Sequence, residues 1–132
     1  MMNLELLYQN PTRSISTVNY IDSDADGAGD LEGIRLQLAN GIAVYLSSGT
    51  DWTLDWDERA DSDLPDWCYP ASSWELRTPE GEIPPELGPC LGIEEIRNSV
   101  GETYGLLITY THVAIRATAG EYFHLEIFPS EA

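Results

Sequence analysis

The chain has 132 residues, and its 6 basic and 23 acidic side chains give a formal net charge of −17. Its hydrophobic fraction of 42% is too high for a disordered acidic tail. No apolar run reaches the roughly 20 residues of a membrane helix, which argues against a membrane span. We therefore expect one folded domain, residues 1–132, that repels nucleic acid and anionic membranes and attracts basic proteins or cations. The first residues resemble no secretion signal, which predicts a cytoplasmic protein.

Apolar residues recur mostly with a period of two, which predicts strands. The first candidates are residues 4–8 and the β-branched segment 14–20. Two alternating runs then flank Asn40-Gly41, a pair typical of a type I′ hairpin turn because both residues tolerate positive φ. The apolar positions of this hairpin are Ile34, Leu36, Leu38, Ile42, Val44 and Leu46.

Two further regions also follow the strand pattern. Residues 51–57 place Trp52, Leu54 and Trp56 on one face and acids on the other, which predicts a half-buried strand with an acidic outer face. Residues 105–118 and 121–128, joined by Ala119-Gly120, predict a second hairpin. The spacing of Ile93, Ile96 and Val100 suggests a short helix.

The segment 58–92 differs from the rest because it holds six of the eight prolines. Proline cannot donate to a sheet ladder, so no central strand is expected here. Trp67, Tyr69 and Trp74 would anchor the segment to the body as an ordered excursion. The predicted fold is mainly β: a small antiparallel sheet or half-barrel of about six strands, this proline-rich excursion, and at most one or two short helices.

The most distinctive local motif is D-x-D-x-D-G-x-x-D at residues 22–30. Calcium takes six to eight oxygen ligands, and alternating aspartates in a tight turn can direct several carboxylates inward. The candidate ligands are Asp22, Asp24, Asp26, the carbonyl of Ala28, and Asp30. The alternative interpretation is an acidic surface turn.

The motif resembles the calcium loops of EF-hands, thrombospondin type 3 repeats and integrin-type propeller hairpins. It departs from the EF-hand pattern at its last position, where Gly33 stands in place of a bidentate glutamate and Glu32 is one residue off. The propeller-type hairpin fits better because strands are predicted on both sides. The resemblance implies calcium as a ligand, whereas no other cofactor is expected.

A second cluster of acids lies between residues 51 and 66, interleaved with tryptophans. Clustered carboxylates repel one another unless a partner neutralises them, and aromatic side chains beside them are common interface anchors. The candidate partner-binding residues are Asp51, Asp55, Asp57, Glu58, Asp61, Asp63, Asp66 and Trp67. The alternative is a solvated face with Trp52 and Trp56 in the core, which leaves Trp67 as the better interface candidate.

The remaining reactive residue types form no recognisable catalytic motif. Cys68 and Cys90 lack metal-site or redox spacing; they are expected to be reduced in the cytoplasm, or to form one disulfide in an exported protein. With Ala119-Gly120 as a two-residue turn, His112 would face Ile127 and His124 would face Ile115, on opposite faces of the sheet. The six arginines form no stripe for nucleic acid. A catalytic function is therefore not expected.

In size, charge and strand pattern the chain resembles the small acidic immunity proteins that bacteria encode beside polymorphic or contact-dependent toxins. This resemblance implies a non-enzymatic inhibitor that masks a basic toxin or a nucleic-acid-binding protein. Its carboxylates would lie where the phosphates of a nucleic-acid substrate would bind. The alternatives are a calcium-dependent structural or adhesive β domain, and a β domain with another function.

Overall fold

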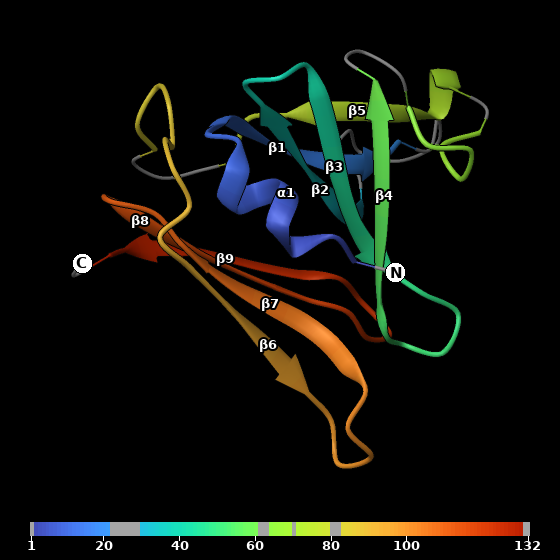
Figure 1. Cartoon of the computed structure of the whole chain (residues 1–132). Coiled ribbons are helices and arrows are strands. Elements are labelled where there is room, and N and C mark those ends of the chain that lie inside the picture. Colours follow the sequence, from blue (N-terminus) through green and yellow to red (C-terminus); the bar gives the residue numbers. More distant parts are fainter. Residues whose placement is uncertain (1, 22–29, 61–63, 70, 80–82, 131–132) are drawn as a thin grey trace.

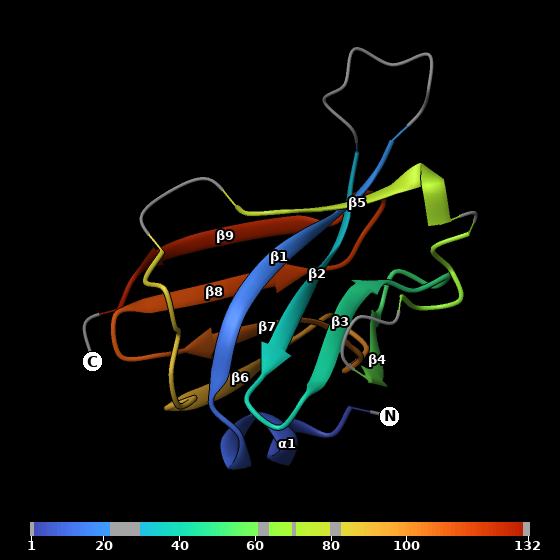
Figure 2. The ribbon, with the colours of Figure 1, turned by 90° about the horizontal axis from the view of Figure 1, so that it is seen from above.

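The structure is a computed structural model that describes residues 2–21, 30–60, 64–69, 71–79 and 83–130. Within these residues nine strands form two antiparallel sheets, accompanied by one α-helix and one short 3₁₀ turn (Figure 1). The strands of the two sheets cross each other when the molecule is seen from above (Figure 2). The prediction of a mainly β fold is confirmed, and the second sheet raises the number of strands above the expected six.

The first sheet contains the strands of the N-terminal half and has the order β4-β3-β2-β1-β5. Its strands are β1 (Thr12–Tyr20), β2 (Asp30–Leu38), β3 (Ile42–Ser48), β4 (Leu54–Ala60) and β5 (Trp74–Arg77). The Asn40-Gly41 hairpin is confirmed, but only Gly41 has a positive φ, of 89°. The Gly41 N–H donates to the Leu38 carbonyl at 3.2 Å. The connection is therefore a type I turn followed by a left-handed glycine, not a type I′ turn.

The second sheet contains the C-terminal strands in sequence order, β6-β7-β8-β9. They are β6 (Gly92–Arg97), β7 (Thr103–Thr109), β8 (Val113–Thr118) and β9 (His124–Pro129). The predicted helix near Ile93 is wrong, because that segment pairs with β7 as an edge strand. The predicted long strand 105–118 is divided by a turn at residues 110–112 into β7 and β8. The β8–β9 hairpin is confirmed.

The segment predicted as a first strand forms the helix α1 (Leu4–Gln9) instead. Its three leucines fit both a strand and one face of a helix, so periodicity over six residues could not decide between them. Leucine, glutamate and glutamine favour the helix, and Leu6 and Leu7 bury themselves in the core. The Tyr8 hydroxyl accepts a hydrogen bond of 2.8 Å from the Ile93 N–H. The helix therefore also supplies a hydrogen-bond acceptor to one backbone N–H at the outer edge of β6.

The main core fills the space between the two sheets. The first sheet contributes Ile34, Leu36, Val44 and Leu46, and the second contributes Leu106, Ile108 and Ile115; all are fully buried. A smaller apolar cluster covers the other face of the first sheet, where Tyr45 packs with Val18, Ala43 and Cys68. The first sheet is thus covered on both faces, which explains why the sequence of β3 is almost continuously apolar.

A buried hydrogen bond joins the start of β1 to the end of β7. Thr12 Oγ1 and Tyr110 Oη lie 2.8 Å apart, and neither residue is exposed to solvent. Burial also raises the pKa of the Tyr110 phenol, so this hydroxyl stays protonated at neutral pH. The backbones of Thr12 and Gly88 bond to each other reciprocally at 2.9 Å, which ties the excursion to the same point.

Replacing Tyr110 by phenylalanine should lower the free energy of unfolding by about 1–2 kcal/mol, because the Thr12 hydroxyl would stay buried without its partner. Chemical denaturation monitored by circular dichroism measures this change. Tyr122→Phe is the matched control: Tyr122 is 71% exposed, so the same substitution there should leave stability unchanged. Equal effects of the two substitutions would contradict a structural role for the Thr12–Tyr110 bond.

The proline-rich segment 58–92 begins as part of β4 and ends where β6 starts. Between them it forms the short 3₁₀ turn Ala71–Ser73 and then β5, which pairs only with β1 at the edge of the first sheet. No described part of the segment forms a central strand, as the prolines require. Trp67 and Trp74 are partly buried and contact each other edge to face, with ring centroids 5.3 Å apart.

Candidate protein-interaction surface

Strand β4 carries the largest group of the predicted acidic residues, and it is one of the two edge strands of the first sheet. Its pairing with β3 places Trp56 opposite Leu46 and Glu58 opposite Val44, on the face that bounds the main core. Asp57 lies opposite Tyr45, on the other face, which it shares with Asp55. The predicted acidic face is therefore divided between the two faces of one edge strand.

On the outer face, Arg59 neutralises part of this charge. Its guanidinium bonds Asp57 at 2.9 and 3.2 Å and lies 3.7 Å from the carboxylate of Asp66. Asp55 and Glu58 remain exposed, and no described arginine lies within 4.0 Å of either carboxylate. Glu58 accepts a hydrogen bond of 2.8 Å from the Trp56 indole. Asp55 and Glu58 are thus the β4 acids most available to a partner.

Of Trp52 and Trp56, which the sequence pattern places together on the core face, only Trp56 lies there. Trp56 packs against the core as expected, but Trp52 precedes β4 in a turn and is 62% exposed. Trp67 is partly buried against the outer apolar cluster and contacts Trp74. Trp52 is therefore more exposed than the predicted interface residue Trp67, which keeps part of its surface accessible, and both stay candidates. The signal missed in the sequence was Ser48-Gly49 before Trp52, which ends β3 and starts a turn.

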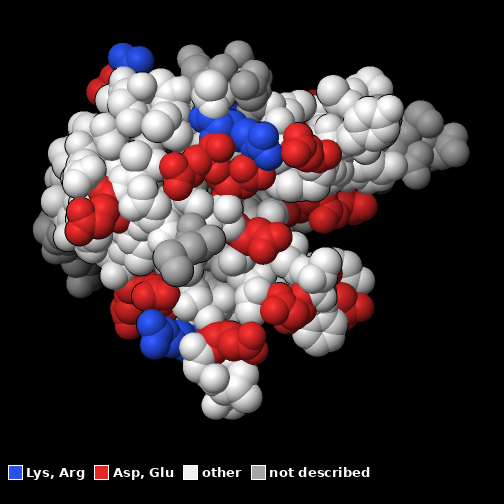
Figure 3. Space-filling view, turned by 45° about the vertical axis from the view of Figure 1, so that its right-hand side comes forward, with Lys and Arg blue, Asp and Glu red and all other residues white. Residues whose placement is uncertain are grey.

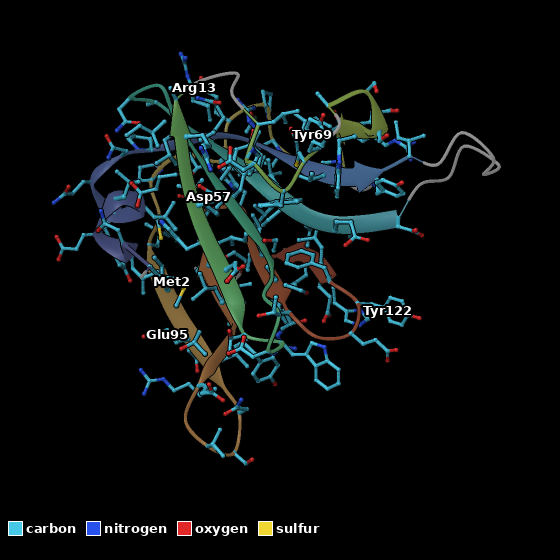
Figure 4. All side chains as sticks on the ribbon, turned by 90° about the vertical axis from the view of Figure 1, so that its right-hand side faces the viewer. Met2, Arg13, Asp57, Tyr69, Glu95 and Tyr122 are labelled. Carbon is cyan, nitrogen blue, oxygen red and sulfur yellow. The ribbon has the colours of Figure 1, made fainter. Side chains whose placement is uncertain are left out.

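The edge strand of the second sheet, β6, lies on the same side of the molecule as β4 (Figures 1 and 4). It adds Glu94, which is exposed, and Glu95, whose carboxylate contacts Arg97 at 3.4 Å and Thr103 at 2.8 Å. On this side acidic side chains outnumber arginines (Figure 3). We call Asp51, Asp55, Glu58, Glu94, Glu95 and Glu102 together the acidic side.

The remaining members of the predicted clusters are only partly described. Asp61 and Asp63 lie outside the described residues, as do Asp22, Asp24, Asp26 and Ala28. Asp30 is the first residue of β2 and pairs with Tyr20, the last residue of β1. The candidate calcium motif therefore begins after β1 and ends at the first residue of β2, and these two strands are paired. Burial and the negative charge of Asp30 raise the pKa of Glu32 nearby.

The two cysteines lie on opposite faces of the first sheet. Cys68 belongs to the outer apolar cluster, whereas Cys90 belongs to the core between the sheets. Both thiols are free and buried. Burial raises the pKa of Cys68 to about 11 and also raises the pKa of Cys90. Because thiols react as thiolates, neither cysteine is suited to nucleophilic chemistry at neutral pH.

The predicted positions of the histidines are wrong, because the β8–β9 connection spans residues 119–123 instead of two residues. His124 pairs with Thr118, and Ile115 pairs with Ile127. His112 lies in the turn between β7 and β8, where its carbonyl accepts a bond from the Ser130 N–H. The two imidazoles thus belong to opposite ends of β8, too far apart to share one ion.

Within the described residues, no three His, Cys, Asp or Glu side chains are grouped as metal ligands. None of the described helices is both long and apolar enough to cross a bilayer. The fold and the acidic side define an antiparallel two-sheet β protein with a charged lateral surface. No family model matches the chain, and neither the curated proteins nor the solved structures contain a significant match to it.

Proposed function

We propose that this chain is a non-enzymatic acidic binding protein that inhibits a basic protein partner, in the manner of an immunity protein that masks a toxin. The observation that carries the proposal is the acidic side: the edge strands β4 and β6 present carboxylates on one side of the molecule, and Asp55 and Glu58 have no described arginine within 4.0 Å. Carboxylates gathered on one surface attract a positively charged protein and favour encounters in which that surface faces the partner.

Docking of the acidic side over a basic cleft would place carboxylates at the positions where substrate phosphates bind. The apolar residues of β4, Leu54 and Trp56, support this surface from the core side. The strand is paired along its length with β3, from Ile42↔Ala60 to Ser48↔Leu54. A surface on such a preformed strand loses little conformational freedom on binding, which favours affinity.

The test is affinity capture at low salt with the immobilised chain, followed by elution with increasing salt. We expect at least one protein with a high isoelectric point to bind and to elute with salt, and its activity to be inhibited by the free chain. Serum albumin, also acidic, serves as the matched bait for nonspecific ion exchange. Recovery of no basic protein beyond those bound by the albumin bait would refute the proposal.

Calcium binding at residues 22–30 is the second candidate function. The pairing of Tyr20 with Asp30 favours it, because this pairing brings the two ends of the motif together at the start of β2. In this case the protein would be a calcium-dependent structural or adhesive domain.

Thermal melts in chelator, calcium and magnesium at matched ionic strength test the second candidate. Calcium at a hundredfold excess over Kd stabilises the folded state by about 2.7 kcal/mol, or several degrees in a domain of this size. Asp24→Ala and Asp26→Ala should abolish the shift. An equal, small shift with both cations would reflect screening of the net charge and would exclude a specific site.

A further inference from the structure

Trp52 combines an unusual backbone conformation with an exposed aromatic side chain. It has a φ of 65°, the only left-handed non-glycine residue among those described, and 62% of it is exposed. A left-handed conformation costs a residue other than glycine about 1–3 kcal/mol, and an exposed indole adds an unfavourable contact with water. Neither cost is offset by burial of the ring in the fold.

Hydrogen bonds hold the turn that presents Trp52. The Trp52 N–H donates to the Gly49 carbonyl at 3.1 Å, and the Gly49 N–H donates to the Thr53 carbonyl at 2.7 Å. The Asp51 carboxylate accepts bonds from the Thr53 hydroxyl and backbone at 2.5 and 3.3 Å. The indole is therefore displayed on a closed turn, and binding would need little further ordering of the backbone.

The turn borders a hollow of about 360 Å³ where the tip of the first sheet meets the second sheet. We call it the Trp52 hollow; its lining residues are Asp51, Trp52, Arg97, Asn98, Tyr104, Ala119 and Gly120. Hydrogen bonds from both sheets hold residues 119–120 in place. The Ala119 N–H donates to the Tyr104 carbonyl in the second sheet, and the Gly120 N–H donates to Ser48 Oγ in the first. Two aromatic side chains, one carboxylate and one guanidinium thus border a shallow hollow that is open to solvent.

The charge around the hollow favours a cation. Arg97, its only basic lining residue, is 3.4 Å from the carboxylate of Glu95. Asp51 supplies the carboxylate of the lining itself, and Glu102 lies next to the hollow in the chain, where its backbone N–H donates to the side chain of Asn98. The Thr53 hydroxyl and backbone keep the pKa of Asp51 below its usual value, so this rim group stays ionised into the acidic range.

We propose that the Trp52 hollow receives an arginine side chain of the basic partner, with the guanidinium stacked on the Trp52 indole and hydrogen-bonded to the Asp51 carboxylate. Guanidinium is planar, weakly hydrated and able to stack and donate at once, whereas the ammonium of lysine is a strongly hydrated point charge. This inference rests on the proposed function only for the identity of the partner, a basic protein.

The first experiment uses a short arginine-rich peptide as the probe and follows the indole N–H resonances by NMR. The Trp52 signal is assigned with the Trp52→Phe variant. Two further peptides are compared with the arginine-rich peptide, one with lysine and one with citrulline, a neutral isostere, in place of each arginine. We expect a saturable shift of the Trp52 signal with the arginine peptide, a smaller shift with the lysine peptide and no shift with the citrulline peptide. Asp51→Asn should reduce the shift. A shift that is absent, or equal for the three peptides, would overturn the inference.

The second experiment measures affinity for the basic protein captured by the chain. Trp52→Ala should weaken it by about 10-fold or more, as expected for a central aromatic anchor. Tyr69→Ala is the matched control, because Tyr69 is 83% exposed, lies on the excursion (Figure 4) and does not line the hollow. If Trp52→Ala binds as the unmodified chain does, the inference fails and the proposed function stands. If no basic partner is captured, the proposed function fails, and the peptide titration still tests the hollow.

Discussion

Gly33→Ala is expected to lower the free energy of unfolding by about 3 kcal/mol, the upper range for forcing an extra methyl group into a packed site. Gly33 lies in β2 and pairs with Ser47 of β3. A Cβ at this position would meet the backbone carbonyl oxygen of Leu46 well inside van der Waals contact. A backbone atom in the middle of a sheet cannot rotate away, so β3 would have to shift and its pairing with β2 would weaken.

Equilibrium denaturation of the two proteins measures the effect, and Gly92→Ala supplies the control. Gly92 also lies in a strand, β6, but a Cβ there meets no atom within 4 Å. Its replacement should be neutral or slightly stabilising, because alanine restricts the unfolded chain. A Gly33→Ala protein as stable as the Gly92→Ala protein would show that β2 and β3 are farther apart at Gly33 than in this structure.

Asp55→Asn combined with Glu58→Gln is expected to weaken association with the basic partner by about 10-fold at low salt, mainly through a slower association rate. Both carboxylates are exposed on β4, so neutralising them reduces the electrostatic attraction of the basic partner without disturbing the core. The difference in association rate between this variant and the unmodified chain should shrink as salt is added, because salt screens exposed charges. Association kinetics at several salt concentrations measure both effects.

Glu75→Gln combined with Glu126→Gln provides a control with the same change in net charge. These residues lie on β5 and β9, the strands at the opposite edges of the two sheets. If binding uses the acidic side, this variant should keep nearly the full association rate. Equal losses in both variants would show that the total charge, and not its position, attracts the partner.

The amino-acid sequence by itself determined the local elements of this fold. The hairpin at Asn40-Gly41, β1, and the β8–β9 pair follow from alternation and turn residues within a few positions of one another. The prolines likewise confined the excursion to an edge position. These features depend on backbone sterics and on which face of a strand is apolar, and both are encoded locally.

Only the tertiary structure decided the elements whose local pattern was ambiguous. Residues 4–9 form a helix because Leu6 and Leu7 bury themselves in the core, and residues 92–97 form a strand because β7 pairs with them. Trp52 fits the alternation of β4, yet the turn after Gly49 removes it from the strand and exposes it. The same turn brings it beside Tyr104 and Gly120, more than fifty residues away. Such contacts depend on distant segments packing together, a cause that no short window of sequence contains.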